Sequence, residues 1–357
     1  MSEKKGNDGP YKKFAQGIFI VKSKNSSFNS DFSGLQKRLP DEEGTIYATD
    51  KALKYCIRKY LYDNGEKVFT WRRNDKKTGL PFNINNNYNF LFKEIPKTEV
   101  KEGNKKKEVI DKIKMLSSLL STIDSRLFGF TYAGETNLSV TGSTQISYGI
   151  NKLKESQFYS NQILSPYQDV TKEKAQQQTL GSETKTLEAH YVYDFIINPN
   201  NLISDIEFIE ENDRQKLLLS QEDIDKFKEA ICKGVNYVNS ASKIGCEGEL
   251  LLFIESDTKE DEKTKKLKGT LLPLMKDLIK IKKPENDEEK IKIDLSGVFE
   301  KVAKYLLKEK DSKDNNKYLI EIYYNPDFTQ LDGVNNNFNV SEKNIITLKE
   351  IPKNNKP

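Results

Sequence analysis

The fold of this chain is decided by the stretch Tyr191-Val192-Tyr193-Asp194-Phe195-Ile196-Ile197. Its aromatic and β-branched residues predict a buried strand. An amphipathic helix is expected next at Gln221–Val238, where apolar residues recur at helical spacing. Ser220 and Asp223 form an approximate capping box at the start of this helix. The apolar run Leu250–Ile254 then predicts a second strand.

The same strand–helix–strand order occurs earlier in the chain. Gly17–Val21 predicts a strand, Asp50–Tyr62 a helix, and Arg126–Phe130 a second strand. Two such units in succession predict an α+β fold with a ferredoxin-like βαββαβ sheet, which RNA-recognition modules also use. Outside these units the pattern predicts helices at 106–123, 271–281 and 295–307, and a last strand at Tyr318–Tyr324.

The aromatic residues of the decisive strand alternate along the chain. Tyr191, Tyr193 and Phe195 therefore share one face of the sheet. In a conventional RNA-recognition module such residues stack on bases. The opposite face here carries His190 and Asp194, so we expect the aromatic face to be buried. His190 is the only histidine, and we interpret it as a packing or surface residue.

Composition limits the class of protein. Hydrophobic residues make up 36% of the 357 residues and charged residues 31%. No apolar run is long enough to span a membrane, and no signal-type segment opens the chain, so we expect a cytoplasmic protein. Cys56, Cys232 and Cys246 are too scattered for a metal cluster. They are expected to be buried free thiols.

The charge is unevenly distributed along the chain. The net charge is +4, but residues 1–130 contain 26 Lys and Arg against 16 Asp and Glu, whereas residues 131–357 contain 32 against 38. A basic first half suits a polyanionic partner, because phosphate neutralisation supplies most of the affinity for nucleic acid. Lysine-rich solvent faces without a partner give the same asymmetry, so charge alone does not decide.

Motifs for catalysis are absent from the sequence. We find no G-x-S-x-G elbow, no G-x-x-x-x-G-K-[ST] phosphate loop and no G-x-G-x-x-G turn. One histidine and three dispersed cysteines do not make a conventional zinc site. The sequence therefore predicts a binding protein, not an enzyme, without a metal or cofactor.

Several segments carry groups suited to a phosphate chain. Lys51, Lys54 and Arg58 lie on one face of the first helix, a pattern that also fits an ordinary solvated face. Three loops place small, hydroxyl or basic residues around glycines, which suits an RNA backbone or, equally, a tight structural turn. These loops are 124–129, 141–149 and 240–245.

Taken in order, these segments resemble the Cas-seven family, the repeated backbone subunit of type I CRISPR Cascade complexes, most nearly its Csh type of subtype I-B. The resemblance is carried by Asp124–Gly129, then by Gly142–Gly149, then by Ser242-Lys243-x-Gly245 before a Leu-rich strand. The family tends to read G-P-V-Q-x-S-x-G in the second segment. Ser143 and Thr144 replace Pro and Val here.

The resemblance implies a palm, a finger and a thumb. The ferredoxin-like palm would comprise 12–62, 106–150, 189–255 and 315–350. A finger-like insertion would occupy 63–105 and a thumb arm 151–188, and a helical, charged insertion would occupy 256–314. Copies of the chain would polymerise along the crRNA spacer together with other Cascade subunits. They would leave the guide bases free to pair with target DNA.

The resemblance also implies roles for individual residues. RNA-binding residues would be Lys37, Arg38, Lys51, Lys54, Arg58, Arg126, Gln145, Ser147, Tyr148 and Lys243. Nucleotide displacement by the thumb would involve Phe158, Tyr159 and Ile163.

Two other functions stay open from the sequence. One is a type III-like backbone subunit that cleaves target RNA with a divalent metal, with Asp31 as the candidate residue in the loop after the first strand. The other is a stand-alone RRM-like RNA-binding protein that forms no filament.

Overall fold

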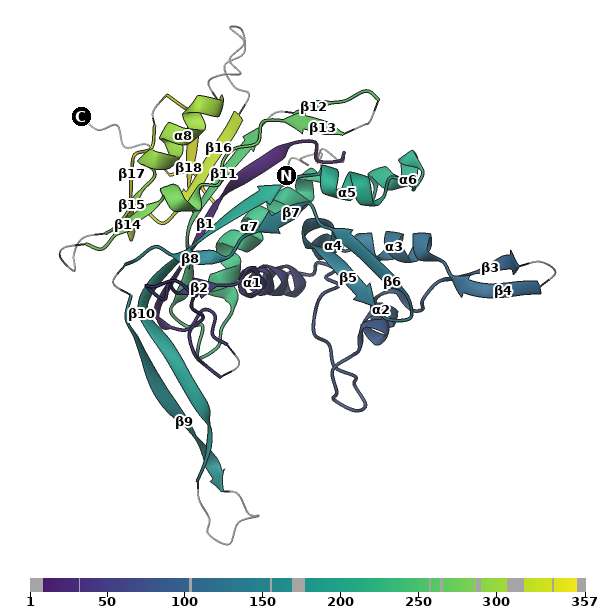
Figure 1. Cartoon of the computed structure of the whole chain (residues 1–357), viewed down its shortest axis with the longest axis horizontal. Coiled ribbons are helices and arrows are strands. Elements are labelled where there is room, and N and C mark those ends of the chain that lie inside the picture. Colours follow the sequence, from purple (N-terminus) through teal and green to yellow (C-terminus); the bar gives the residue numbers. More distant parts are fainter. Residues whose placement is uncertain are drawn as a thin grey trace, which may run out of the picture.

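The structure is a computed structural model with one large sheet at its centre (Figure 1). It describes residues 9–31, 33–102, 105–154, 156–168, 177–256, 258–263, 266–284, 286, 290–306, 318–335 and 337–351. Three long strands form the middle of the sheet: β11 (Cys246–Ser256), β1 (Phe14–Ser26) and β10 (Gln177–Ile197). β1 pairs antiparallel with both of its neighbours. The expected strands at 17–21, 191–197 and 250–254 are therefore confirmed, each as part of a longer strand.

Shorter strands extend the sheet on both sides. Beyond β11 lie β16 and then β18, which runs parallel to β16. On the other side β10 pairs antiparallel with both β7 and β8, and β2 pairs with β8. These strands are β2 (Tyr47–Ala48), β7 (Thr144–Ile146), β8 (Gly149–Asn151), β16 (Tyr318–Tyr324) and β18 (Val340–Asn344). The last expected strand, 318–324, is confirmed as β16. The edge of the sheet on this side is β18.

Helices α1 (Asp50–Asp63) and α7 (Gln221–Tyr237) cover one face of the sheet. Thr49 caps α1, and the Ser220–Asp223 capping box at the start of α7 is confirmed. The two helices pack closely at Gly234, where a Cβ atom would lie 2.9 Å from the carbonyl oxygen of Cys56. Their apolar stripes bury the aromatic face of β10, as expected from the sequence.

The opposite face of the sheet is also covered. Ile20, Val192 and Leu250 pack there against η1 (Lys276–Leu278), β14 (Lys280–Lys282), β15 (Ile291–Asp294) and α8 (Ser296–Leu306). β17 (Thr329–Asp332) runs parallel to β15 in this layer. The expected helix at 295–307 is confirmed as α8. The helix expected at 271–281 is wrong, because only the short turn η1 and strand β14 form there.

The strand expected at 126–130 is wrong over residues 126–128 and is confirmed only for residues 129 and 130, which begin β5 (Gly129–Ala133). Residues Ile123–Phe128 form helix α4, which ends at Gly129 with a φ of 73°. The chain then continues as β5, paired only with β6 (Asn137–Thr141) in a separate two-stranded sheet. Glycine is needed here because a Cβ on residue 129 would lie 2.2 Å from the carbonyl oxygen of Val140. The strands that pair with β10 at this side are instead β7 and β8.

Two hairpins project from the body (Figure 1). β9 (Phe158–Gln168) pairs antiparallel with the first half of β10 to form a long ribbon, which we call the arm. β3 (Lys97–Glu102) and β4 (Lys105–Ile110) form the second hairpin. The helix expected at 106–123 is therefore wrong over its first residues, and α3 (Lys112–Leu120) begins only after the Asp111 cap. The remaining elements are α2 (Ile84–Phe92), α5 (Asn200–Asp205), α6 (Glu211–Gln215), β12 (Thr258–Glu260) and β13 (Leu267–Gly269).

The only histidine is part of a buried charge cluster. His190 is fully buried on β10, with its Nδ1 atom 2.5 Å from Glu249 and its Nε2 atom 3.2 Å from Glu188. Burial alone lowers the pKa of His190, but the two carboxylates outweigh it and raise the pKa to about 9. His190 is therefore an imidazolium that joins β10 to β11, in agreement with the packing role expected from the sequence.

We predict that His190→Gln lowers the free energy of unfolding by about 2 kcal/mol at pH 6, since Glu249 loses a charged hydrogen-bond partner. The pKa of His190 in the folded protein lies above its ordinary value of 6.5, so the imidazolium stabilises the fold fully below pH 6.5. This contribution is lost as the pH rises through 9. Urea unfolding of both proteins at several pH values should show the difference shrinking. An undiminished difference above pH 9.5 would contradict a charged His190.

Candidate nucleic-acid interface

The residues expected at a nucleic-acid surface fall into two groups in the structure. Some are exposed and make no ion pair with a described residue, and others are held by partners inside the protein. The first group lies along one line, from the base of the arm to the start of α1.

The base of the arm is joined to the long loop after β1. The Nε2 atom of Gln36 donates to the Thr184 carbonyl oxygen at 2.8 Å, which ties the loop to the arm. Next to it, the guanidinium of Arg38 lies 4.3 Å from the ring centre of Phe158. Both side chains are exposed. Lys37 is half-buried, and its carbonyl oxygen accepts from the backbone N–H of Tyr47. The contact of Arg38 with Phe158 thus brings together a residue expected to bind phosphate and a residue expected in the thumb.

An aromatic pair follows at the edge of the sheet. Tyr148 is 51% exposed, and its ring stacks on Tyr47 with the ring centres 5.4 Å apart. Ser147 is half-buried, and its hydroxyl accepts from the backbone N–H of Asp194 and donates to the Tyr148 carbonyl oxygen. Gln145 is exposed, although its Nε2 atom donates to the Gly142 carbonyl oxygen at 3.0 Å. The loop that carries these residues is fixed on β10 by the β7 pairing.

Helix α1 begins at Asp50, three residues after Tyr47, and presents its cations to a cleft of about 710 Å³. Lys51 is exposed and makes no ion pair with a described residue. Lys54 pairs with Asp50 at 3.0 Å. Arg58 pairs with the fully buried Asp124 at 3.1 Å. Of the three cations on this helix face, only Lys51 is therefore available without breaking an internal pair.

Asp124 is a structural residue that sequence reasoning did not identify. Besides Arg58, its carboxylate accepts from the backbone N–H groups of Phe69 and Thr70, at 2.7 and 2.9 Å. It thereby fixes the loop that forms one wall of the cleft to helix α4. Little in the sequence indicated this role, because the hydrogen-bond partners Phe69 and Thr70 lie more than fifty residues from Asp124 along the chain.

Two more of the expected RNA-binding cations are held by internal partners. Arg126 donates two hydrogen bonds to Asp223, at 2.7 and 2.8 Å, and one to the Leu120 carbonyl oxygen. Lys243 donates to the Phe28 carbonyl oxygen, and its ammonium lies 4.8 Å from the ring centre of Phe28. Burial lowers the pKa of Lys243. Both cations fasten distant parts of the chain to one another.

The remaining expected residues lie on the arm. Tyr159 is 37% exposed on β9, and its backbone is opposite Lys185 of β10. Ile163 is opposite Gly181 in the same ribbon, and its side chain lies outside the described residues. The arm thus places Phe158 at its base and Ile163 further out.

Asp31 is held in a tight turn. Its Oδ1 atom accepts from the hydroxyl of Ser33 and from the backbone N–H groups of Ser33 and Leu35. The hydroxyl of Ser33 and the other donors lower the pKa of Asp31. Among the residues that the structure describes, no cluster of three or more His, Cys, Asp or Glu is placed to hold a metal ion. The three cysteines are free and buried, as expected.

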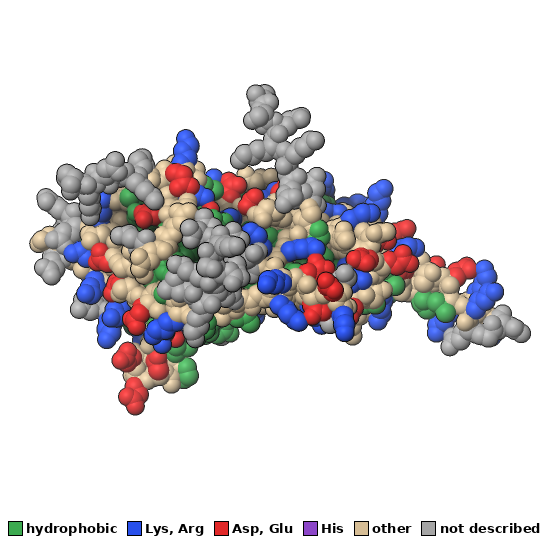
Figure 2. Space-filling view, turned by 90° about the horizontal axis from the view of Figure 1, so that it is seen from above, with side chains coloured by type: hydrophobic (Ala, Val, Ile, Leu, Met, Phe, Trp, Pro, Cys, Tyr) green, Lys and Arg blue, Asp and Glu red, His purple; other side chains and the backbone are tan. Residues whose placement is uncertain are grey.

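Charges of both signs are interspersed over the face shown in Figure 2. The β3–β4 hairpin extends beyond the body, with lysine side chains near its far end.

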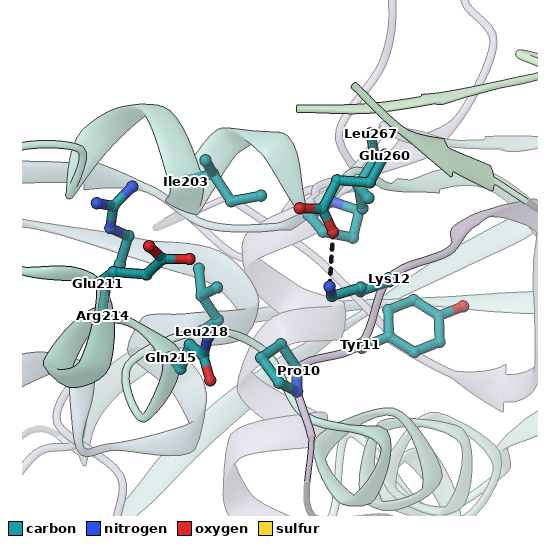
Figure 3. Close-up of a pocket in the computed structure, with 11 residues that line it drawn as sticks. Pro10, Tyr11, Lys12, Ile203, Glu211, Arg214, Gln215, Leu218, Glu260 and Leu267 are labelled. Carbon is teal, nitrogen blue, oxygen red and sulfur yellow. Dashed lines mark hydrogen bonds and ion pairs between the residues drawn. The ribbon is translucent and has the colours of Figure 1, made fainter. Parts of the chain in front are cut away.

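A second cavity, of about 170 Å³, lies between the N-terminal segment and helices α5 and α6 (Figure 3). Lys12 pairs with Glu260 across it at 2.6 Å. This cavity contains none of the expected RNA-binding residues.

Within the described chain, no helix combines the length and the apolar character needed to cross a membrane.

Comparison with known proteins identifies one family. The family model of the CRISPR-associated protein Cas7 matches residues 13–296. No curated protein matches the chain significantly. The chain is similar to a chain of a solved structure described as "CRISPR RNA-guided surveillance complex, pre-nicking", with a TM-score of 0.44, 10% identity, and coverage of 94% of this chain and 98% of that one. A second, "CRISPR RNA-guided surveillance complex", has a TM-score of 0.40, 10% identity, and coverage of 96% and 95%.

The internal partner of Arg126 leads to a prediction about stability. Arg126→Leu should lower the free energy of unfolding by about 3 kcal/mol, because it leaves Asp223 buried without its cation. Lys51→Leu should change it by less than about 0.5 kcal/mol, since Lys51 is exposed. Chemical denaturation measures both. Equal effects of the two substitutions would contradict the distinction drawn between held and available cations.

Proposed function

Because the chain belongs to the CRISPR-associated protein Cas7 family, we propose that it is a crRNA-binding backbone subunit of a Cascade-type surveillance complex. Copies of it would polymerise along the spacer of the guide, as a type I-B subunit of Csh type. They would act together with other Cascade subunits in the cytoplasm. The guide bases would remain free to pair with target DNA, and the chain itself would be non-catalytic.

The arrangement of the central strands supports this proposal. The order is β11-β1-β10 followed by β7 and β8, with antiparallel neighbours and with α1 and α7 on one face. A ferredoxin-like palm would have this order of strands. Both faces of the sheet are covered in this chain. RNA would therefore bind along the edge and the loops beside it. The arm would serve as the thumb, and the β3–β4 hairpin would belong to the finger.

The observation that carries the proposal is the line of exposed groups along this edge. Arg38 forms a backbone bridge with Ile46, the next residue is Tyr47 of the aromatic pair, and α1 with Lys51 follows. Arg38 and Lys51 are exposed cations that make no ion pair with a described residue, although Arg38 also donates to the Gly44 carbonyl oxygen at 3.2 Å. Two such cations with an exposed aromatic surface between them suit a single strand, in which phosphates alternate with bases. Each protomer offers few charges, but a row of protomers adds them along one RNA.

The line of exposed groups predicts the effect of charge reversal. The Arg38→Glu, Lys51→Glu double variant should weaken binding of guide-length RNA at least about tenfold and reduce its salt dependence, because phosphate contacts are lost. Binding is measured over a series of salt concentrations.

Lys301→Glu is the control for this experiment, a reversal of one charge away from the proposed RNA-binding edge. Lys301 is an exposed lysine on α8 that makes no ion pair with a described residue, and α8 covers the opposite face of the sheet. This variant should bind RNA like the wild type. The proposal fails if Lys301→Glu weakens RNA binding as much as the double variant does. It also fails if the double variant binds RNA as tightly as the wild type.

A non-catalytic role predicts that no RNA is cut. With divalent metal present, the wild type and Asp31→Ala should both leave a complementary target RNA intact, because Asp31 would have no catalytic function. Gel electrophoresis of the target RNA after incubation gives the result. Cleavage at regular spacing that is lost in Asp31→Ala would show instead the type III-like activity.

A further inference from the structure

Three aromatic rings form a stack beside the cationic cleft. Tyr55 and Tyr62 lie two helical turns apart on α1. The ring of Trp71 fits between them, with ring centres 5.5 Å from Tyr55 and 5.1 Å from Tyr62 and interplanar angles of 17° and 24°. Both faces of the indole are thus covered by tyrosines. The faces left at the ends of the stack belong to Tyr55 and Tyr62.

The two ends of the stack differ in their surroundings. At the Tyr62 end, the guanidinium of Arg73 lies 5.4 Å from the ring centre, and Arg73 itself is buried and bonded to Asn87 and to the Val68 carbonyl oxygen. Tyr62 is 38% exposed but does not line the cleft of about 710 Å³, whereas Tyr55 is 48% exposed and lines it. The end of the stack that faces the cleft is therefore Tyr55.

Cations line the cleft around Tyr55. Lys51 precedes Tyr55 by one helical turn, and Arg72 follows Trp71 directly. Both are exposed and make no ion pair with a described residue. Among the described residues, Asp50 is the only carboxylate that lines this cleft, and it pairs with Lys54. The cleft thus joins a flat aromatic surface to two available positive charges.

We propose that the Tyr55 end of the stack is a subsite for one nucleobase of a bound single strand, with Lys51 and Arg72 holding the adjoining phosphates. The proposal rests on the proposed function, since it takes the strand to be one that the line of exposed groups binds. A nucleobase has a flat face that can stack on a tyrosine ring. The phosphates on either side of the base are anions that can pair with Lys51 and Arg72. The volume of the cleft lies within the range of about 300–1,000 Å³ typical of small-ligand sites.

The stack is more than is needed to fasten the loop. Asp124 already fixes the neighbouring residues Phe69 and Thr70 by their backbone N–H groups, and Arg73 fixes the other side of Trp71. A large ring at residue 55 is not required for these bonds, yet it extends the stack into the cleft. Tyr55 can therefore be changed with little effect on the loop, which makes the subsite testable.

The experiment compares two short RNA strands of equal length and charge, one with normal bases and one abasic. Tyr55→Leu should weaken binding of the normal strand about 5- to 100-fold, the range that loss of one base–aromatic stack produces. Binding of the abasic strand should be unchanged. Tyr55→Phe should bind both strands like the wild type, because it keeps the ring. Tyr305→Leu, which changes a similarly exposed tyrosine on α8, serves as the control and should have no effect.

The results separate this subsite from the proposed function. Equal weakening of the normal and abasic strands by Tyr55→Leu would show that Tyr55 only positions the cations, and would overturn the base subsite alone. An unchanged affinity for both strands would overturn it as well. A wild type that binds neither strand would refute the proposed function and the subsite together. Trp71 is the only tryptophan, so the fluorescence emission of each variant reports whether the loop that carries Trp71 keeps its position.

The same comparison with DNA identifies the source of the base. A base-dependent loss confined to RNA would assign the subsite to the guide, whereas a loss confined to DNA would assign it to the target strand. Either result supports a base subsite at Tyr55. The absence of a base-dependent loss with both nucleic acids would overturn it.

Discussion

Burial of both faces of the central sheet is the constraint on which the rest of this structure depends. Strand β1 contributes Phe19 to the core under α1 and α7, and Ile20 to the core under α8. A conventional RNA-recognition module leaves one sheet face open for bases, but that surface is covered here. Under the proposed function, RNA would therefore bind beyond the faces, where β2, β8 and the start of α1 meet. Arg38, Lys51 and the aromatic pair Tyr47–Tyr148 lie along that edge.

Internal ion pairs shape the interface as much as the exposed groups do. Asp124 and Asp223 are buried carboxylates, and each takes a cation that sequence reasoning had assigned to RNA, Arg58 and Arg126. A buried carboxylate is costly without such a partner, so these arginines are committed to the fold. They fasten α4 to α1 and α7 and fix the wall of the cleft. What they leave for a phosphate chain is a small set of exposed side chains, chiefly Arg38, Lys51 and Arg72.

The sequence was most informative where side-chain periodicity controls structure. The helices α1 and α7 and the strands β1, β10 and β11 follow from repeating apolar patterns and from caps such as Ser220. Short runs were ambiguous, because a run of a few residues fits a helix or a strand equally well. Residues 126–128 were expected in a strand but belong to helix α4. Ion pairing could not be foreseen, since partners such as Arg126 and Asp223 are 97 residues apart. For the same reason, the stack of Trp71 on α1 became visible only in the folded chain.

The measurement that tests the account most directly is the mass of the assembly formed on RNA strands of two lengths, by native mass spectrometry. If many protomers bind one ribose-phosphate strand along their edges, doubling the strand should about double the number of bound protomers. Reversal of charge at Arg38 and Lys51 should abolish this growth. One protomer bound to either strand, or no RNA bound at all, would contradict the account.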